Sequence, residues 1–290
     1  MEILNQIILI LLFLFFPVFC MGIIRKIRAR AQGRKGPPLL QSFYDIERFI
    51  KKTPIDGTYS GHFSEISPIL FVLAGFLMWT IAVYEWMPFL LIPFFIALQR
   101  IALTGFAMET GTSFGGLGTS RELLLSISSE PIILLSILVA QTKLQIPFSW
   151  VSVALGALFL SALLVAILAE LARPPFDDPR THLELTMVHE AMLLEASGKT
   201  LAFFELGYQL KITTLLVLVS RIGLEHTKFL NSSLPKQIEN LITLFSVILL
   251  SILIGYWESI SVRRKWNWVP EVMGMTLLFI LVIGSLVKLN

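Results

Sequence analysis

Residues 148–171 read FSWVSVALGALFLSALLVAILAEL, a run of 24 residues with one charged side chain, Glu170. A helix of that length rises about 36 Å, enough to cross the roughly 30 Å hydrocarbon layer of a bilayer. We therefore expect this stretch to be a transmembrane helix. Similar apolar runs recur along the chain, and they predict spans at about 3–24, 66–84, 88–107, 122–142, 148–171, 200–222, 238–258 and 270–288.

The composition of the 290-residue chain agrees with this pattern. Hydrophobic residues make up 55% of the sequence and charged residues only 15%. That is more apolar surface than the core of one globular domain encloses, so lipid must cover the excess. The sequence thus predicts an all-α integral membrane bundle of about eight transmembrane helices. It would form a single polytopic membrane domain over residues 1–290 with a long cytoplasmic loop.

The basic residues predict the orientation of the bundle. Sixteen of the 23 Lys and Arg residues fall in four segments that an eight-span bundle places on one side: 25–65, 108–121, 172–199 and 259–269. Positively charged loops stay in the cytoplasm. The chain is therefore predicted to lie in the inner (plasma) membrane of the cell, with both termini on the outer side. The net charge of +3 is then a topology signal, and we expect no nucleic-acid partner.

Ligands for a metal or a redox cofactor are scarce in the sequence. The single cysteine, Cys20, rules out a Cys-x-x-Cys pair of the kind that holds zinc or iron–sulfur clusters. His189-Glu190 lacks the second histidine of a His-Glu-x-x-His zinc helix. We expect this chain to bind no metal and no cofactor, so partner proteins must carry any electrons.

Carboxylates, in contrast, are frequent at membrane depth. Ten of the twenty acidic residues lie in, or at the inner ends of, the third to sixth spans and their connecting loops. A carboxylate is costly inside a bilayer, and one that is kept there usually serves proton or ion transfer. Glu130, Glu170 and Glu205 have apolar neighbours in the sequence and are the first candidates for such a path.

The loop after residue 171 is predicted to bend at the membrane surface and then to form a second helix. Pro174, Pro175 and Pro179 cannot continue a helix, and a helical pattern resumes over residues 181–195. Eleven residues are nearly three helical turns, so Glu184 and Glu195 would share one face, with Glu190 on a neighbouring face. Within the fourth span, Pro131 is expected either to start or to break a helix.

The segment 25–52 contains nine basic residues, and an amphipathic run over residues 39–50 follows the stretch Gly33–Pro38 within it. Such a segment lies on anionic headgroups or offers a landing surface for a soluble partner. The candidate docking residues are Arg28, Arg30, Arg34 and Lys35.

Three motifs in and after the proline-rich loop resemble the long cytoplasmic loop of one membrane-protein family. They read Glu170…Arg173-x-Pro175-Phe176-Asp177-x-Pro179, Glu184-Leu185 and Glu195-x-Ser197-Gly198. The family is the heel subunit of respiratory complex I, also called NADH dehydrogenase subunit 1. The same subunit occurs in membrane-bound nickel–iron hydrogenases such as formate hydrogenlyase.

The basic segment supports the same resemblance and indicates a branch of the family. Arg28-Ala29-Arg30-Ala31-Gln32-x-Arg34-Lys35-Gly36-Pro37 is similar to the segment that follows the family's first helix. The quinone-reducing branch typically continues with Asn-Arg, whereas this chain has Pro38-Leu39, which is nearer to the hydrogenase branch. The loop is also about three residues longer than the family pattern between Asp177 and Glu195.

The resemblance implies a non-catalytic anchor beneath a soluble electron-transfer arm, at the start of a charged path toward ion-pumping subunits. It implies Glu130, Glu170, Glu184 and Glu195 as path carboxylates. Glu190 and Glu205 complete our set of candidates for the proton or ion path, and Arg173 and Asp177 are the implied organisers of the loop. The implied partners are hydrogenase-like large and small subunits, an iron–sulfur subunit and antiporter-like membrane subunits. These would hold the nearby iron–sulfur cluster and the nickel–iron centre, or a quinone.

The predicted function is therefore that of an anchor and ion-coupling subunit of a formate hydrogenlyase-like complex that moves H⁺ or Na⁺. One alternative is the quinone-site subunit of a complex I-type NAD(P)H or ferredoxin:quinone oxidoreductase. A second is a stand-alone secondary transporter that uses the same carboxylates. Transporters of that kind commonly contain inverted repeats, and we find no such symmetry in the sequence.

Overall fold

The computed structural model describes residues 2–55, 61–141, 150–177, 187–228 and 235–288, and its regular structure over these ranges is entirely helical. The elements are α1 (Glu2–Ala31), α2 (Gln41–Ile50), α3 (His62–Tyr84), η1 (Phe89–Leu91), α4 (Ile92–Glu109), α5 (Ser113–Gln141), α6 (Trp150–Glu170), α7 (His189–Met192), α8 (Gly198–Lys228), α9 (Lys236–Ile260) and α10 (Trp268–Lys288). The predicted all-α class is confirmed.

Each of the eight predicted spans coincides with one long helix. In the described part of the chain, six of these are long and apolar enough to cross a membrane: α3, η1 with α4, α5, α8, α9 and α10. Helix α6 is not among the six, because its described apolar part, Ala154–Glu170, belongs to the shorter apolar helices of 10–17 residues. An all-α membrane bundle is therefore confirmed, while the count of eight crossings stays a prediction.

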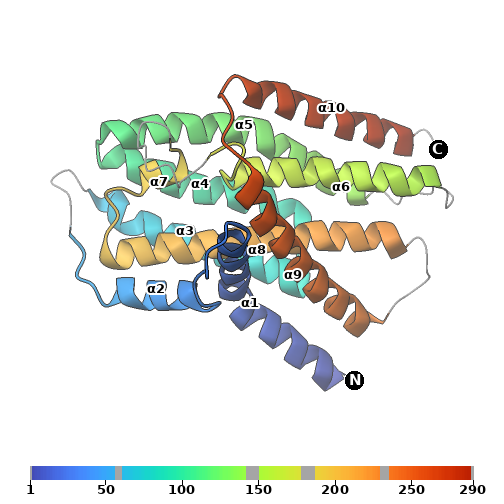
Figure 1. Ribbon diagram of the computed structural model, residues 1–290, viewed down its shortest axis with the longest axis horizontal. Coiled ribbons are helices and arrows are strands. Elements are labelled where there is room, and N and C mark those ends of the chain that lie inside the picture. Colours follow the sequence, from blue (N-terminus) through green and yellow to red (C-terminus); the bar gives the residue numbers. More distant parts are fainter. Residues whose placement is uncertain (1, 56–60, 142–149, 178–186, 229–234, 289–290) are drawn as a thin grey trace.

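The long helices form one bundle, shown in Figure 1. Helices α3, α4, α5, α6, α8 and α10 run roughly side by side, and α1 and α9 cross them obliquely while packing along each other. Fully buried aromatic side chains such as Trp79, Phe159 and Phe204 fill the interior. The beginning of α1 and the end of α10 lie toward the same end of the bundle.

Glycine permits two close approaches within this bundle. A Cβ atom on Gly22 would lie 1.8 Å from the carbonyl oxygen of Leu39, because α1 passes directly beside the chain that enters α2. A Cβ atom on Gly207 would lie 2.3 Å from the ring of Phe71, where α8 packs against α3. Any larger side chain at either position would force these segments apart.

Helix α5 corrects one expectation, since it neither begins nor ends at Pro131 but continues from Ser113 to Gln141. Proline removes one backbone N–H from the helix, yet membrane helices tolerate this where neighbouring helices hold the segment. Here α5 packs against α4, α6 and α10. Glu130 is thereby held on a continuous helix within the bundle.

The predicted helix over residues 181–195 is also wrong in its described part. Only α7 is helical there, and Leu193 to Glu195 form a turn. The backbone N–H of Val188 donates to the Asp177 carboxylate at 2.9 Å, and Arg121 donates to the carbonyl of Met187 at 3.3 Å. Side chains from elsewhere thus occupy backbone groups that a helix would need. Residues 178–186, including Glu184, lie outside the described residues.

Contacts join all four segments predicted to be cytoplasmic. The hydrogen bonds that join them include Phe63 N to Glu109 Oε1, Ile55 N to Ser197 Oγ, Arg121 Nη1 to Met187 O and Arg264 N to Pro175 O. These loops therefore cluster at one end of the bundle. The side of the membrane that this end faces stays a prediction from the positive charges.

We predict that cysteines placed at Lys236 and Lys265 label from opposite sides of the membrane. Both residues are exposed and flank α9, a helix of 25 residues. A membrane-impermeant maleimide added to whole cells should react with Lys236→Cys, while Lys265→Cys should react only after permeabilisation. A Cys20→Ala background removes the one native thiol. Labelling of both sites from outside would contradict the orientation.

Candidate functional site

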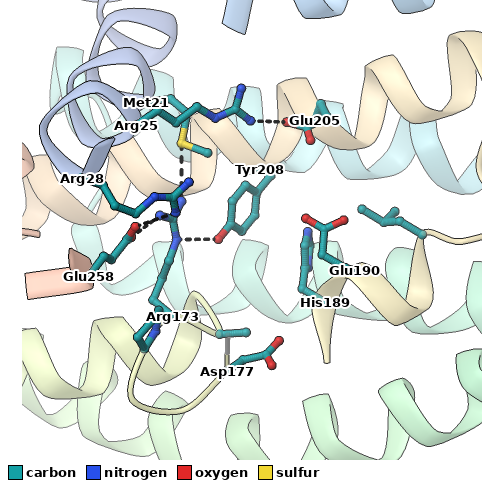
Figure 2. A pocket seen from close by; sticks show the side chains of 13 residues that line it. Met21, Arg25, Arg28, Arg173, Asp177, His189, Glu190, Glu205, Tyr208 and Glu258 are labelled. Atoms are coloured by element: carbon teal, nitrogen blue, oxygen red, sulfur yellow. Dashed lines mark hydrogen bonds and ion pairs between the residues drawn. The ribbon is translucent and has the colours of Figure 1, made fainter. Parts of the chain in front are cut away.

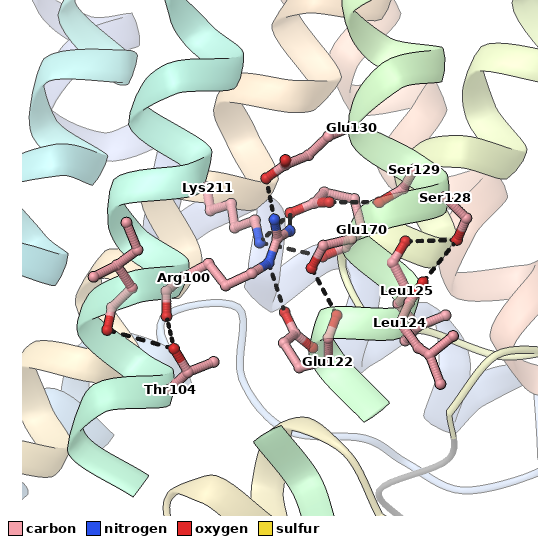
Figure 3. A network of polar contacts seen from close by, with 12 residues as sticks. Arg100, Thr104, Glu122, Leu124, Leu125, Ser128, Ser129, Glu130, Glu170 and Lys211 are labelled. Atoms are coloured by element: carbon pink, nitrogen blue, oxygen red, sulfur yellow. Dashed lines mark hydrogen bonds and ion pairs between the residues drawn. The ribbon is translucent and has the colours of Figure 1, made fainter. Parts of the chain in front are cut away.

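Five charged side chains from four helices meet inside the bundle (Figure 3). Arg100 comes from α4, Glu122 and Glu130 from α5, Glu170 from the last turn of α6, and Lys211 from α8. All are buried except Glu130, which is half-buried. We call these five residues the membrane charge cluster.

Glu170 is the centre of the membrane charge cluster. Arg100 Nη2 donates to Glu170 Oε1 at 2.5 Å, and Lys211 Nζ lies 2.7 Å from the same oxygen. Ser129 donates to Glu170 Oε2 at 2.7 Å. Arg100 also pairs with Glu130. A buried carboxylate is tolerated when opposite charges and hydrogen bonds replace its hydration, and Glu170 has both.

The position of Glu170 at the end of α6 adds a second electrostatic demand. The carboxyl end of a helix carries partial negative charge, which disfavours a carboxylate there. Lys211 offsets this partial negative charge, because its ammonium group also donates a hydrogen bond to the main-chain carbonyl of Glu170 at 3.2 Å. Lys211 thus neutralises the side chain and the helix end together.

A small cavity of about 10 Å³ adjoins the membrane charge cluster, with room for about one water molecule. Arg100 Nε and Glu122 Oε2 are buried without hydrogen-bond partners among the described residues, and the other carboxylate oxygen, Glu122 Oε1, lies 3.8 Å from Arg100 Nε. Both residues line the cavity. A water there could accept from the guanidinium and donate to the carboxylate, which satisfies both groups.

A larger pocket of about 110 Å³ lies at the loop end of the bundle, between α1, α7, α8 and the turn after α6 (Figure 2). We call it the loop pocket. Its charged lining consists of three arginines and four carboxylates: Arg25, Arg28, Arg173, Asp177, Glu190, Glu205 and Glu258.

A turn at the end of α6 leads directly from the membrane charge cluster to the loop pocket. The N–H groups of Ala172 and Arg173 donate to Ala169 O and Leu168 O, the pattern of a Schellman cap. Ala172 adopts a left-handed conformation with φ 46°. Glu170 consequently points into the cluster, while Arg173, three residues later, points into the loop pocket.

Glu258 holds the loop pocket together. Its carboxylate is fully buried, accepts from Arg28 Nη1 at 3.0 Å and also pairs with Arg173. Arg173 Nε donates in turn to the Tyr208 hydroxyl at 3.0 Å. One carboxylate at the end of α9 thus links α1, α8 and the turn after α6.

The carboxylates predicted for the proton or ion path lie at three kinds of position: the membrane charge cluster, the loop pocket and the surface. Glu130 and Glu170 belong to the membrane charge cluster, while Glu190 and Glu205 line the loop pocket, where Glu205 lies 3.7 Å from Arg25. Glu195 is exposed on the turn after α7 and lines neither cavity. Asp177, predicted to organise the loop, is fully buried and accepts the Val188 N–H.

The predicted docking residues also divide. Arg30, Arg34 and Lys35 are exposed, as a contact surface requires. Arg28 instead turns inward to Glu258. Its spacing in the basic segment could not reveal this, because Glu258 lies 230 residues away in the sequence.

Four residues at the centre of the two sites have no role in the sequence analysis: Arg100, Glu122, Lys211 and Glu258. Arg100 and Lys211 interrupt apolar spans, and a cation at membrane depth is itself a signal of function or pairing. Glu122 was one acid among many near the inner ends of spans. Glu258 gave no signal, because an acid at the end of an apolar run is common.

Two neighbours in the loop pocket have shifted pKa values. The imidazole of His189 is enclosed although the residue as a whole is half-buried; burial, then Lys211 and Arg173, lower its pKa to about 3. Glu190 is exposed as a residue, yet partial burial of its carboxyl group and then the Glu205 carboxylate raise its pKa. His189 is therefore neutral at pH 7, and Glu190 takes up a proton more readily than an ordinary glutamate.

Within the described ranges, no group of three or more His, Cys, Asp or Glu side chains is arranged to hold a metal ion. The chemistry that this arrangement supports is proton and charge transfer between side chains.

The fold and the two polar sites define a multi-pass membrane protein with charged groups paired inside its bundle. Residues 4–289 match the family model described as NADH dehydrogenase, so the chain belongs to the NADH dehydrogenase (complex I subunit 1-like) family. The family assignment from the loop motifs is confirmed.

Two relatives from Escherichia coli (strain K12) are similar to this chain. Hydrogenase-4 component C is 30% identical over 282 residues, which cover 91% of this chain and 88% of that protein. Formate hydrogenlyase subunit 4 is 32% identical over 216 residues, covering 66% and 67%. In the solved structure of the membrane-bound sulfane sulfur reductase, an archaeal respiratory membrane complex, one chain has the same fold, with a TM-score of 0.78, 18% identity and 99% coverage of both chains.

We predict that Glu258→Ala strongly destabilises the chain, because it leaves the guanidinium groups of Arg28 and Arg173 without their shared carboxylate. Breaking a buried ion pair costs about 3 to 5 kcal/mol. The control is Glu47→Ala, which removes the exposed pair with Lys51 and should cost less than about 1 kcal/mol. Thermal unfolding in detergent measures both, and equal melting temperatures for the two variants would contradict the role of Glu258.

Proposed function

We propose that this chain is the non-catalytic membrane-anchor and ion-coupling subunit of an energy-converting hydrogenase complex of the formate hydrogenlyase type. The two hydrogenase relatives support this proposal, since one of them matches this chain over nearly its whole length. Family membership favours a complex subunit over a stand-alone transporter. A relative from Paracentrotus lividus, NADH-ubiquinone oxidoreductase chain 1, matches only 53% of the chain, which favours the hydrogenase branch over a quinone-site subunit.

The observation that carries the proposal is the membrane charge cluster. It contains three carboxyl groups, those of Glu122, Glu130 and Glu170, but only two cations, Arg100 and Lys211. One carboxyl group can therefore bind and release a proton while both cations keep a carboxylate partner. A site of this kind changes its charge when a proton or another ion arrives, which is what coupling across a membrane arm requires.

Two polar sites at different depths suggest a direction for this coupling. The loop pocket lies where the four clustered loops would face a soluble arm, and the membrane charge cluster lies within the bundle beyond the turn of α6. In this proposal, Glu190 and Glu205 form the outer part of the path and Glu170 with Glu130 the inner part. Glu184 belongs to the expected path but lies outside the described residues.

The redox centres belong to partners in this proposal. The expected partners are hydrogenase-like large and small subunits, an iron–sulfur subunit and antiporter-like membrane subunits. The exposed cations Arg30, Arg34 and Lys35 would form part of the surface on which the soluble arm docks.

We predict that Glu130→Gln and Glu170→Gln uncouple ion movement from electron transfer. Gln keeps the shape and hydrogen bonding of Glu but cannot give up a proton. In sealed vesicles that hold the whole complex, ion translocation should fall by about 10²-fold, the usual contribution of a positioned proton-transfer group. Hydrogen-dependent reduction of an artificial electron acceptor should persist.

The control for this experiment is Glu271→Gln, at an exposed glutamate in the first turn of α10. It should translocate ions at the wild-type rate. Wild-type translocation by both Glu130→Gln and Glu170→Gln would mean that the membrane charge cluster is only structural.

We also predict that the triple variant Arg30→Glu, Arg34→Glu, Lys35→Glu releases the soluble arm while the subunit stays in the membrane. These side chains are exposed, so charge reversal should change docking and leave the bundle intact. Co-purification of tagged subunits measures the association, and thermal unfolding checks the bundle. Arg28→Glu is the contrasting variant, since it should lower stability through Glu258. Recovery of the arm at wild-type yield with the triple variant would exclude this surface.

A further inference from the structure

The loop pocket and the small cavity beside the membrane charge cluster share one wall. Three residues line both spaces: Ala172, His189 and Tyr208. Anything that passes from one space to the other along this shortest route must cross that wall. The chemistry of the three side chains therefore decides what can pass.

Only one of the three side chains is suited to passing a proton. Ala172 has no polar side-chain atom. The Tyr208 hydroxyl accepts from Arg173 Nε at 3.0 Å and donates its own hydrogen to the carbonyl of Leu171 at 2.9 Å. Its single proton is therefore already committed to a carbonyl group, which leaves the imidazole of His189.

The two rings of the wall are stacked. Their centroids are 4.5 Å apart and the planes are inclined by 28°. Because the Tyr208 hydroxyl is fixed at two points, its ring is a firm surface that holds the imidazole in place. Figure 2 shows His189 next to Glu190, on the side of Tyr208 away from Arg173 and Glu258. Among the described residues, neither imidazole nitrogen has a hydrogen-bond partner, so both are available to water or to a transferring group.

We propose that His189 is the proton-transfer residue that connects the loop pocket with the membrane charge cluster, and that Tyr208 is its positioning residue. This inference rests on the proposed function and adds to it the step between the outer and inner parts of the path.

The transfer conserves the charge of the ring. A protonated group in the loop pocket, such as the Glu190 carboxyl or a water beside it, gives a proton to the free nitrogen of the neutral imidazole. The N–H bond on the other nitrogen breaks, and that proton passes to a water in the inner cavity and on to Glu122. The donor loses one proton, the acceptor gains one, and the imidazole ends as its other tautomer, which rotation of the ring resets.

The electrostatic surroundings favour this concerted transfer. Burial, and then the positive charges of Lys211 and Arg173, lower the pKa of His189 to about 3. The ring consequently stays neutral between transfers and keeps one donor and one acceptor nitrogen. A positively charged ring would have two donors and could accept nothing.

The test uses the whole complex in sealed vesicles and compares two variants of His189. His189→Phe keeps a flat ring stacked on Tyr208 but has no nitrogen. We expect ion translocation per turnover to fall by at least tenfold, while electron transfer to an artificial acceptor continues. The control is His62→Phe, at an exposed histidine in the first turn of α3, which should translocate normally.

The second variant, His189→Ala, opens space at the wall and allows chemical rescue. Added imidazole should restore translocation, whereas pyrrole, a ring of similar size without a basic nitrogen, should not. Equal rescue by both compounds, or wild-type translocation by His189→Phe, would overturn the inference.

The same vesicles separate this inference from the proposed function. If the wild-type complex translocates ions and Glu170→Gln does not, while His189→Phe translocates normally, only the role of His189 is wrong. If the wild-type complex itself moves no ions during turnover, the proposed function fails, and the His189 inference with it.

Discussion

The pairing of Glu170 with Arg100 and Lys211 is the interaction on which the rest of the structure depends. A charge left alone at this depth would cost several kcal/mol, so the bundle is stable only if these groups meet. They come from α6, α4 and α8, and each helix must therefore pack at one rotation and one height relative to the others. The glycine contact between α8 and α3 allows the close packing that this register needs.

The end of α6 transmits this constraint to the loop. The Schellman cap places Glu170 and Arg173 on opposite sides of a single turn, one in the membrane charge cluster and the other against Glu258. Ala172 holds the left-handed position of that cap, where glycine would be less strained by about 1 kcal/mol. Because the turn is held at both sides, it connects the contacts of the loop pocket directly with those of the membrane charge cluster.

The chemistry of the two polar sites suits the transfer of protons and charge. The titratable side chains described there are carboxyl, guanidinium, ammonium, imidazole and phenol groups. These groups exchange protons and balance charge. The stacked His189 and Tyr208 line both sites and so separate the outer pocket from the inner cluster.

The sequence by itself determined the membrane class, the helical fold, the approximate positions of the long helices and, through the loop motifs, the family. These follow from local properties: apolar runs as long as the bilayer is thick, prolines after α6, and residues at fixed spacing. It also singled out Glu130 and Glu170, because acids in apolar runs stand out, and the structure places both in the membrane charge cluster. Only the tertiary structure decided that Glu258 binds Arg28 and Arg173, that Glu195 faces outward, and that His189 lies against Tyr208. Those outcomes depend on how helices far apart in the sequence rotate and meet, and no local pattern of residues encodes that rotation.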